Sequence, residues 1–503
     1  MIVAFYAPYS CNLRLFETEL DLMQQEIDNG NEVLFLSCGA LYPICEPNPE
    51  HEFEMCLQCC SRKKVGLNLL SKKPIERKVF NGIRRKDRKE FNLLKRSFKS
   101  SEELKEYRFD EYNIGFGVLS SLIDYTDDPE PDTIVFEKKI DDFISAAYFT
   151  HRAVLNFADD YKFEKLYVFN GRHAFENAAI KAATKKSINY FTYEFGHNKK
   201  HYELNQNALP HDREPKRKEI CKIWQSSSES TLSKIYKAKK YYQNNIKGKE
   251  VSYINYSKNQ KKGKLPSSWK NTDRNICIFN SSEREWAVTS DCRVNWFYPN
   301  QRDGIIRIIK DLTQISLNIA VYLRMHPNMI GSDESYLKDL FKLEKEHSFF
   351  HIIRADSDIC SYTLIKNANT VLTFGSTLGI EAVYLGTPSV LAAEMYYDHL
   401  GSTYNPSSHE ELVKMIIQDL KPKRKLGAYM LGYYLMNYGL PYKYYEATEL
   451  FSGMFKRVKV VHKNYIDKII LYNLHRKRIR LIYNIMIYLF NLRSNLYKLK
   501  LHK

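Results

Sequence analysis

The sequence lacks the features that would mark a membrane-spanning or secreted protein. No run reaches the roughly 20 apolar residues that a transmembrane helix needs. The first ten residues, MIVAFYAPYS, carry no basic segment before the apolar run and no cleavage site after it, so they indicate a buried strand. We therefore expect a cytoplasmic protein that folds in a reducing compartment, where disulfides rarely persist.

Evenly distributed positive charge is also missing. The formal net charge is +17, but the segment from Lys456 to the end holds 13 Lys and Arg against one acid, Asp467. The preceding chain is therefore only about +5. Because no nucleic-acid recognition motif accompanies this charge, we expect no nucleic-acid partner along the body of the chain.

The basic tail, residues 451–503, has its own character. Residues 464–492 mix the cluster Arg476–Arg480 with Tyr, Phe, Leu and Ile, and the apolar run Leu481–Phe490 is too short to cross a bilayer. Such a composition suits a helix that lies in an anionic membrane surface. The alternatives are a helix packed on the body of the protein and an RNA-binding segment.

What the sequence does contain is globular. At 503 residues it is long enough for two or three domains, and 44% apolar residues with 37 Tyr and 27 Phe supply large core side chains. Strands alternate with helices in two blocks, which predicts parallel, doubly wound sheets. The first block has predicted strands at Ile2–Tyr6, Glu32–Ser37, Lys165–Phe169 and Asn189–Tyr193. The second has them at Ile276–Phe279, Ile319–Arg324, Phe349–Arg354, Thr370–Phe374 and Ser389–Ala392.

The polar, basic segment 256–274 contains Gly and Pro and separates the two blocks, so it indicates a linker. This organisation predicts an α/β protein with two Rossmann-like domains facing a cleft. The first would span 1–255 and the second 275–450, followed by the tail at 451–503.

Cysteines are concentrated near the amino terminus, where six of the ten precede residue 61. Cys38, Cys45, Cys56 and Cys59 form C-x6-C-x10-C-x2-C inside an irregular insertion, 38–60. Four thiolates can hold zinc tetrahedrally, so a structural zinc site is one hypothesis. An iron–sulfur cluster also fits the pattern, and so does a set of small buried thiols.

The segment Thr373–Ala392, TFGSTLGIEAVYLGTPSVLA, is the most informative stretch. A strand ends, the chain turns on Gly375, and a helix opens with Ser376 and Thr377. Unpaired amides and the dipole at a helix N-terminus favour a phosphate. Glu381, one turn into the helix, is a candidate acceptor for sugar hydroxyls. Ordinary strand–helix packing is the alternative.

A second signal is the strand end Arg324-Met325-His326-Pro327. Pro327 disfavours helical backbone at His326, which keeps the imidazole at the carboxyl edge of the sheet, where ligands bind in doubly wound folds. Arg324 can offer a planar fork to a phosphate and His326 a directional donor.

These two motifs resemble those of bacterial capsule and lipopolysaccharide glycosyltransferases of the GT-B fold, particularly the Kdo-transferase-like and sialyltransferase-like groups. The resemblance implies that His326, Ser376 and Thr377 hold the nucleotide and phosphate of a nucleotide sugar, with Arg324 and Glu381 as helpers. It implies a sugar transferase that uses a glycan or lipid-linked glycan acceptor at the inner face of the cell membrane. Ser376-Thr377 departs from the family's common Ser-Ser pair but keeps the hydroxyl chemistry.

The amino-terminal half should then hold the acceptor and a base that takes the proton of its hydroxyl. Glu194, which ends a predicted strand, is the first candidate for that base, and His197, Glu17 and Glu19 follow it. Asn170 and Arg172, after another strand, are candidates for binding the acceptor. No DxD motif stands where a metal-dependent transferase would need it, so we expect inverting, metal-independent transfer without a cofactor for catalysis.

Three other functions stay open. A nucleotide-sugar epimerase shares the fold and a similar Glu-bearing stretch, although a basic tail has no evident use in such an enzyme. A non-catalytic scaffold of a polysaccharide assembly complex and an RNA-binding protein are the alternatives outside enzymes. Donor sugar, nucleotide and linkage are not readable from the sequence.

Overall fold

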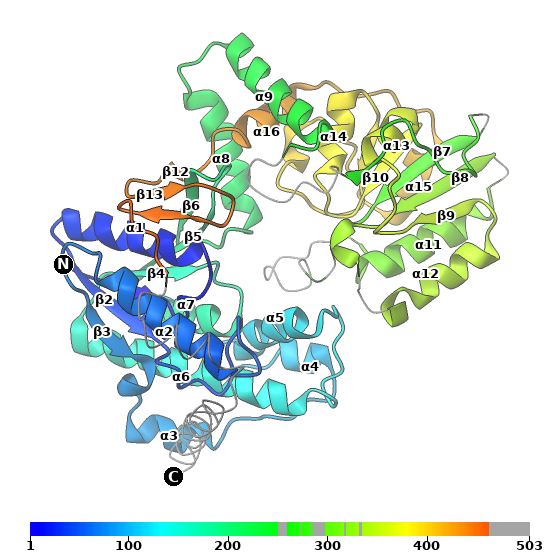
Figure 1. Ribbon diagram of the computed structural model, residues 1–503. Coiled ribbons are helices and arrows are strands. Elements are labelled where there is room, and N and C mark those ends of the chain that lie inside the picture. Colours follow the sequence, from blue (N-terminus) through cyan, green and yellow to red (C-terminus); the bar gives the residue numbers. More distant parts are fainter. Residues whose placement is uncertain are drawn as a thin grey trace, which may run out of the picture. The chain divides into compact units, whose positions relative to one another are not determined.

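The chain forms two compact units in the computed structural model (Figure 1). Unit 1 comprises Met1–Thr126, Glu130–Pro210 and the described residues from Gly439 onward, and unit 2 comprises Asp127–Pro129 and His211–Tyr438. The structure describes residues 1–249, 259–271, 273–282, 284, 297–315, 318–330 and 334–461. The predicted tail helix, 464–492, therefore lies outside the described residues.

Unit 1 is built on a seven-stranded sheet with the order β12-β6-β5-β4-β1-β2-β3. The strands are β1 (Ile2–Tyr6), β2 (Glu32–Ser37), β3 (Ile75–Lys78), β4 (Lys165–Phe169), β5 (Asn189–Phe195), β6 (His201–Gln206) and β12 (Leu440–Pro441). The five strands from β3 to β5 pair in parallel, and β6 and β12 are antiparallel. The parallel part has the order 3-2-1-4-5, which reverses direction between β1 and β4.

Helices cover both faces of this sheet because successive strand residues point to opposite sides. Phe5 of β1 packs in a core with Leu20 and Met23 of α1 (Leu15–Asp28). The next residue, Tyr6, lies within 3.2 Å of the Thr150 hydroxyl on α6 (Glu137–Tyr161). The other helices of unit 1 are α2 (Phe53–Leu67), α3 (Arg85–Phe91), α4 (Ser101–Lys105), α5 (Ile114–Thr126) and α7 (Ala174–Lys185), with the 3-10 helix η1 (Val79–Gly82).

Unit 2 repeats the same strand order in a five-stranded, wholly parallel sheet, β11-β10-β7-β8-β9. Its strands are β7 (Arg274–Phe279), β8 (Ile319–Arg324), β9 (Phe350–Ile353), β10 (Thr370–Thr373) and β11 (Ser389–Leu391). Its helices are α8 (Arg213–Ser226), α9 (Thr231–Ile246), α11 (Gln301–Leu312), α12 (Glu334–Glu346), α13 (Ser361–Asn367), α14 (Leu378–Leu385), α15 (His409–Ile417) and α16 (Leu426–Tyr434), with the short 3-10 helices η3 (Pro327–Met329) and η4 (Asp398–Leu400).

The two faces of this second sheet belong to separate cores. Ile276 and Ile278 of β7 pack with residues of α11 and α12, whereas Cys277 and Phe279 pack with residues of α13 and α14. The predicted fold class, α/β with two Rossmann-like doubly wound domains, is confirmed by these two sheets.

The limits of the two units differ from those predicted from the sequence. The amino-terminal part of unit 1 ends at Pro210, not at residue 255, because α8 and α9 bury Ile220 and Tyr242 against α16 in a core of unit 2. The segment predicted as a linker also belongs to unit 2. Within it, Trp269 stacks on Tyr322 of β8 with ring centroids 4.7 Å apart.

After Tyr438 the chain returns to unit 1, which the sequence analysis did not foresee (Figure 1). β12 pairs with β6, and the hairpin β13 (Tyr445–Ala447) and β14 (Gly453–Phe455) follows it. Asp21 of α1, fully buried, accepts backbone N–H bonds from Tyr444 at 2.6 Å and Tyr445 at 2.8 Å. These bonds hold the returning segment on α1.

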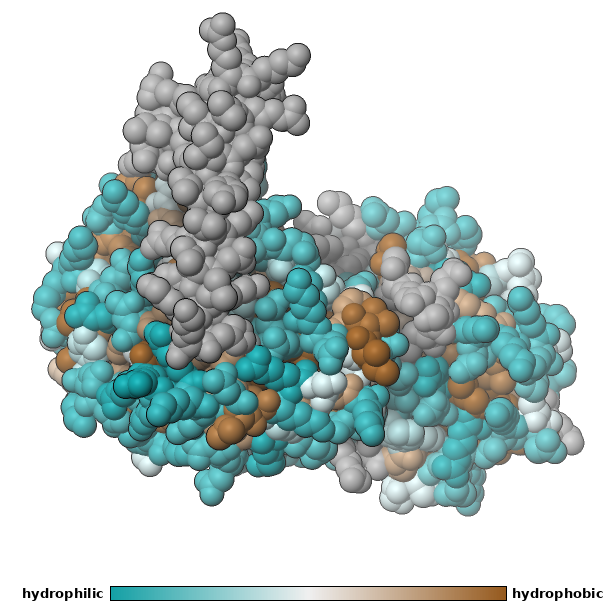
Figure 2. Space-filling model, turned by 90° about the horizontal axis from the view of Figure 1, so that it is seen from below, coloured by the Kyte–Doolittle hydropathy of each residue, from teal (hydrophilic) through white to brown (hydrophobic). Residues whose placement is uncertain are grey.

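The described residues visible on the face shown in Figure 2 are mostly hydrophilic, with scattered hydrophobic residues among them. No helix among the described residues is long and apolar enough to cross a membrane.

Candidate functional site

In unit 2 the order of the strands reverses between β7 and β10, and the loops after these two strands meet at the carboxyl edge of the sheet. This edge is where doubly wound folds bind ligands. The loop after β7 carries Asn280, whose side-chain oxygen accepts a hydrogen bond from the backbone N–H of His326 at 2.9 Å. The ends of β7 and β8 are thereby joined, and the loop after β10 lies beside them because Phe374 N–H donates to the Phe279 carbonyl.

The loop after β10 turns through Gly375, whose φ of +70° favours glycine, and enters α14 at Ser376 and Thr377. The Ser376 hydroxyl accepts the backbone N–H of Leu378 at 3.2 Å, and the Ser376 carbonyl accepts the Tyr397 hydroxyl at 2.5 Å. A Cβ on Gly379 would lie 2.5 Å from that same hydroxyl. The helix N-terminus is therefore held in place by close packing against a buried tyrosine.

His326, beyond the end of β8, is half-buried. Its Nδ1 accepts the backbone N–H of Asn328 at 3.2 Å, which puts the proton of the neutral ring on Nε2. Burial, followed by the charges of Arg324 and Arg284, lowers the pKa of His326 to about 4. At neutral pH the ring is thus an uncharged donor of fixed tautomer.

Arg324 was predicted to offer its guanidinium to a phosphate, but the structure places it in the interior. It is 3% exposed, and its two terminal nitrogens donate to the carbonyls of Arg354 and Ser357, the latter at 3.0 Å. Burial lowers the pKa of Arg324 to about 10. In this structure its guanidinium fixes the loop after β9 and does not present a free fork to a phosphate.

Glu381 also points into the protein interior. Its carboxylate is 4% exposed and accepts the Tyr362 hydroxyl of α13 at 2.7 Å. Burial raises the pKa of Glu381 to about 7, opposed by hydrogen bonds from Tyr362, Asn245 and Thr377. The geometry makes Glu381 a link between α14, α13 and α9.

In unit 1 the order of the strands reverses between β1 and β4. The loop after β4 carries Asn170 and Arg172, the residues predicted to bind the acceptor. Asn170 adopts a left-handed backbone, and its side-chain amide donates to Glu194 Oε2 at 3.0 Å. Arg172 forms an ion pair with Asp124 of α5 at 2.9 Å. The structure thus brings Asn170 and Glu194 together and places Arg172 beside an acid that the sequence analysis did not select.

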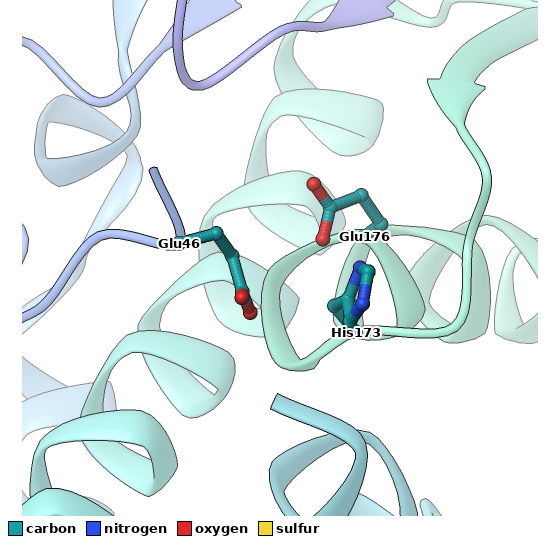
Figure 3. A group of neighbouring side chains, drawn as sticks. All are labelled: Glu46, His173 and Glu176. Carbon is teal, nitrogen blue, oxygen red and sulfur yellow. The ribbon is translucent and has the colours of Figure 1, made fainter. Parts of the chain in front are cut away.

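A cluster of acidic and imidazole side chains stands at this same edge. Glu46, His173 and Glu176 each offer a ligand or proton-transfer atom, all within 4.8 Å of one another (Figure 3). Glu46 reaches in from the loop after β2, and His173 and Glu176 come from the start of α7. His173 Nε2 also lies 2.7 Å from Asp124 Oδ2, while Tyr9, after β1, donates its hydroxyl to Glu176.

The electrostatics of this cluster favour proton sharing. Burial raises the pKa of Glu46 to about 7 and also raises the pKa of Glu176. Burial disfavours a charged His173, but the neighbouring Glu46 and Asp124 outweigh it and raise the pKa of that imidazole. Perturbed groups at a sheet edge are typical of sites that move protons.

Sequence reasoning missed Glu46, Glu176, Asp124 and Tyr9. One signal was present, because His173 and Glu176 are three residues apart at a helix start and therefore share a face. Glu46 and Asp124 lie on a loop and a helix far away in the sequence, and no local pattern joins them to His173.

The model of the family described as capsule polysaccharide biosynthesis proteins matches residues 185–445, more than half of the chain. The chain belongs to this family. The match covers the whole sheet of unit 2 with both of its motif-bearing loops, and it confirms the resemblance drawn from RMHP and GSTLGIEAVYLGTPSVL. No curated protein sequence matches this capsule biosynthesis protein.

Solved structures are similar to this chain only at low identity and low TM-score. Two are Thermosulfurimonas dismutans KpsC, a β-Kdo 2,4 transferase at 11% identity and a β-Kdo 2,7 transferase at 13%, each with a TM-score of 0.35. The alignments cover 54% and 56% of this chain and 79% of those chains. A UDP-N-acetylglucosamine 2-epimerase from Listeria monocytogenes has a TM-score of 0.26 at 10% identity, covering 85% of this chain and 93% of that one. Similarity at this level assigns no activity to the capsule biosynthesis protein.

The remaining candidates for the base have structural partners. Glu17 is 4% exposed and forms a buried ion pair with Arg62 of α2. Glu19 is 2% exposed and accepts the Tyr193 hydroxyl at 2.9 Å. His197 packs against His201 with ring centroids 4.1 Å apart. The partners of Glu17 and Glu19 give these two carboxylates structural roles.

Burial of Glu381 in α14 makes the free energy of unfolding depend on pH. Between pH 4.5 and 7 the unfolded chain releases the Glu381 proton while the folded chain keeps it, so this residue lowers the stability as pH rises through that window. Glu381→Gln mimics the protonated acid and still accepts from Tyr362. The variant should gain stability over the wild type from pH 4.5 to 7, by at most about 3 kcal/mol, and the gain should stay constant above pH 7. Urea unfolding at several pH values measures it, and a gain independent of pH would contradict the assignment.

Proposed function

We propose that this capsule biosynthesis protein is a glycosyltransferase that moves a sugar from a nucleotide-sugar donor to a glycan or lipid-linked glycan acceptor. The observation that carries the proposal is the family match over 185–445, which contains the helix start at Ser376 and the histidine donor at the end of β8. A growing polysaccharide gains each sugar through a new glycosidic bond, and a departing nucleotide needs donors at its phosphates.

We assign binding of the nucleotide-sugar donor to unit 2. The Ser376 hydroxyl at the amino end of α14 and the Nε2–H of His326 would meet the phosphates, since each is an uncharged donor whose side chain is held by a hydrogen bond that it accepts. The buried Arg324 would support this edge of the sheet indirectly, by holding the loop after β9.

Unit 1 would bind and activate the acceptor. Glu46 is the half-buried carboxylate of the cluster, whereas Glu176 is fully buried, so we propose Glu46 as the base. The acceptor oxygen would attack the anomeric carbon, its proton would pass to Glu46, and the nucleotide would leave with the bonding electrons. This direct displacement inverts the anomeric carbon. Glu194, held by Asn170, is the alternative base.

Peripheral binding to the inner face of the membrane remains part of the proposal. It rests on the composition of the basic tail, residues 451–503, most of which lies outside the described residues.

The donor site is tested by thermal shift with CMP-, UDP-, GDP- and dTDP-linked sugars, because a ligand that binds the folded state raises its stability. One class should raise the melting temperature of the wild type. His326→Ala and Ser376→Ala should each weaken that binding roughly 10- to 100-fold, because a hydrogen bond to a charged group contributes about 1.5–3 kcal/mol. His347→Ala is the matched control, since His347 precedes β9 at the opposite edge of the sheet.

Two outcomes would contradict these assignments. Unchanged donor affinity in both variants would remove the helix start and the histidine from the donor site. A sugar altered by the protein in the absence of any acceptor would replace the transferase with an epimerase.

A further inference from the structure

Six cysteines from three separate segments of unit 1 line one small cavity of about 20 Å³. They are Cys11 after β1, Cys38 and Cys45 in the loop after β2, and Cys56, Cys59 and Cys60 on α2. A void of this size has room for roughly one water-sized particle. Folding therefore brings together thiols that lie up to 49 residues apart in the sequence.

Three of these sulfur atoms accept hydrogen bonds from N–H groups. The backbone N–H of Ser10 lies 3.0 Å from Cys59 Sγ, and that of Ala40 lies 3.3 Å from Cys38 Sγ. The side-chain amide of Asn48 lies 3.4 Å from Cys56 Sγ. A thiol is only a weak acceptor, whereas a thiolate benefits from such donors, and donors to sulfur are part of the surroundings that tune metal–thiolate centres.

All six of these cysteines are free thiols. Among the described residues, the His, Cys, Asp and Glu side chains whose ligand atoms gather within 4.8 Å of one another are Glu46, His173 and Glu176. No three of the six sulfur atoms are therefore that close to one another. A single zinc ion with Zn–S bonds of about 2.3 Å would hold its sulfurs only about 3.8 Å apart. The sulfurs would therefore move closer together around a zinc ion, whereas the cavity of about 20 Å³ would widen around an iron–sulfur cluster.

We propose that this cavity binds a metal centre, a zinc ion or an iron–sulfur cluster, through the thiolates of Cys38, Cys45, Cys56 and Cys59. The ligand set joins the loop after β2 to α2. The proposal is independent of the glycosyltransferase assignment, since the evidence for it is the arrangement of the thiols alone.

The centre would also position the acidic cluster described above. Cys45 directly precedes Glu46, and Tyr9 lines the cavity while its hydroxyl donates to Glu176. A metal that ties Cys45 to α2 would therefore restrict the loop that carries Glu46. Its role in the protein would be structural, with an indirect effect on the carboxylate.

The experiment is metal analysis of the full-length chain, produced with iron and zinc supplied and purified without oxygen. The wild type should hold about one centre per chain, either zinc without sulfide or iron with acid-labile sulfide and visible absorption. The double variant Cys38→Ser/Cys59→Ser should lose it. Cys221→Ser, which changes a half-buried thiol of unit 2, should keep the full metal content.

Stoichiometric zinc without sulfide would support the thiolate centre as a zinc site, and iron with sulfide would support it as a cluster. Wild-type protein that is folded, free of metal and reactive at all of these thiols would overturn the proposal, and so would full metal content in the double variant. If the double variant does not fold, hydrogen exchange of the wild type before and after chelation replaces it. Loss of metal should then speed exchange in residues 38–60 and leave the strands of unit 2 unchanged, whereas unchanged exchange in 38–60 would refute a positioning role.

Discussion

Glu46→Gln is expected to lower the rate of sugar transfer roughly 10²- to 10⁴-fold, the usual contribution of a general base. The amide keeps the size of the side chain and can still accept the Ser121 hydroxyl that contacts Glu46. It cannot take a proton from the acceptor. The measurement is kcat with saturating donor and acceptor, together with donor affinity by thermal shift, which should not change.

The same loop offers a matched control. Glu50 is exposed and pairs with Lys139 at 2.6 Å, so Glu50→Gln should leave kcat close to that of the wild type. A fully active Glu46→Gln beside an inactive Glu194→Gln would transfer the role of the base to Glu194. An equal loss of kcat in Glu46→Gln and Glu50→Gln would mean that the substitutions act by disturbing the loop and not by removing a base.

Arg62→Ala is expected to destabilise unit 1 by about 3–5 kcal/mol, because it leaves the Glu17 carboxylate buried without its cation. Arg62 also donates to the carbonyls of Ser10 at 2.6 Å and Val460 at 3.0 Å, so the substitution disconnects α2 from two other segments. Urea unfolding, with hydrogen exchange in β1 and β2 as the local readout, measures the loss.

Two further variants separate the buried charge from the lost packing. Adding Glu17→Gln to Arg62→Ala removes the stranded charge and should recover part of the stability. Arg84→Ala breaks a pair with Asp160 in which both side chains are more than 40% exposed, and it should cost no more than about 1 kcal/mol. If the double variant were less stable than Arg62→Ala, the carboxylate would not be the source of the cost.

The regular elements could be predicted well because their signals are local. The strand bounds of β1, β2, β4 and β8 agree with the predicted ones to the residue. Buried parallel strands are continuous apolar runs, and Gly30 and Gly386 end the preceding helices. Three strands of the first sheet, β3, β6 and β12, were missed. β3 and β6 are rich in polar residues and β12 has only two residues, so none of them shows the apolar run of a buried strand.

The domain limits could not be predicted in the same way. The segment 256–274 has the composition of a linker, yet Trp269 packs on β8. The true transition, at Pro210, depends on which core receives the apolar faces of α8 and α9. That choice is made by packing and leaves little trace in composition.

The sequence by itself determined the two doubly wound sheets and the motif-bearing loops at Ser376 and His326. Strand ends, glycine turns and helix starts depend on residues that are adjacent in the sequence. The tertiary structure decided which charged groups are available. It turned Arg324 and Glu381 inward, paired Glu17 with Arg62, and assembled Glu46, His173 and Glu176 from separate segments. It also gathered six cysteines around one cavity. Burial and ion pairing depend on contacts between residues distant in the sequence, and no local pattern records such contacts.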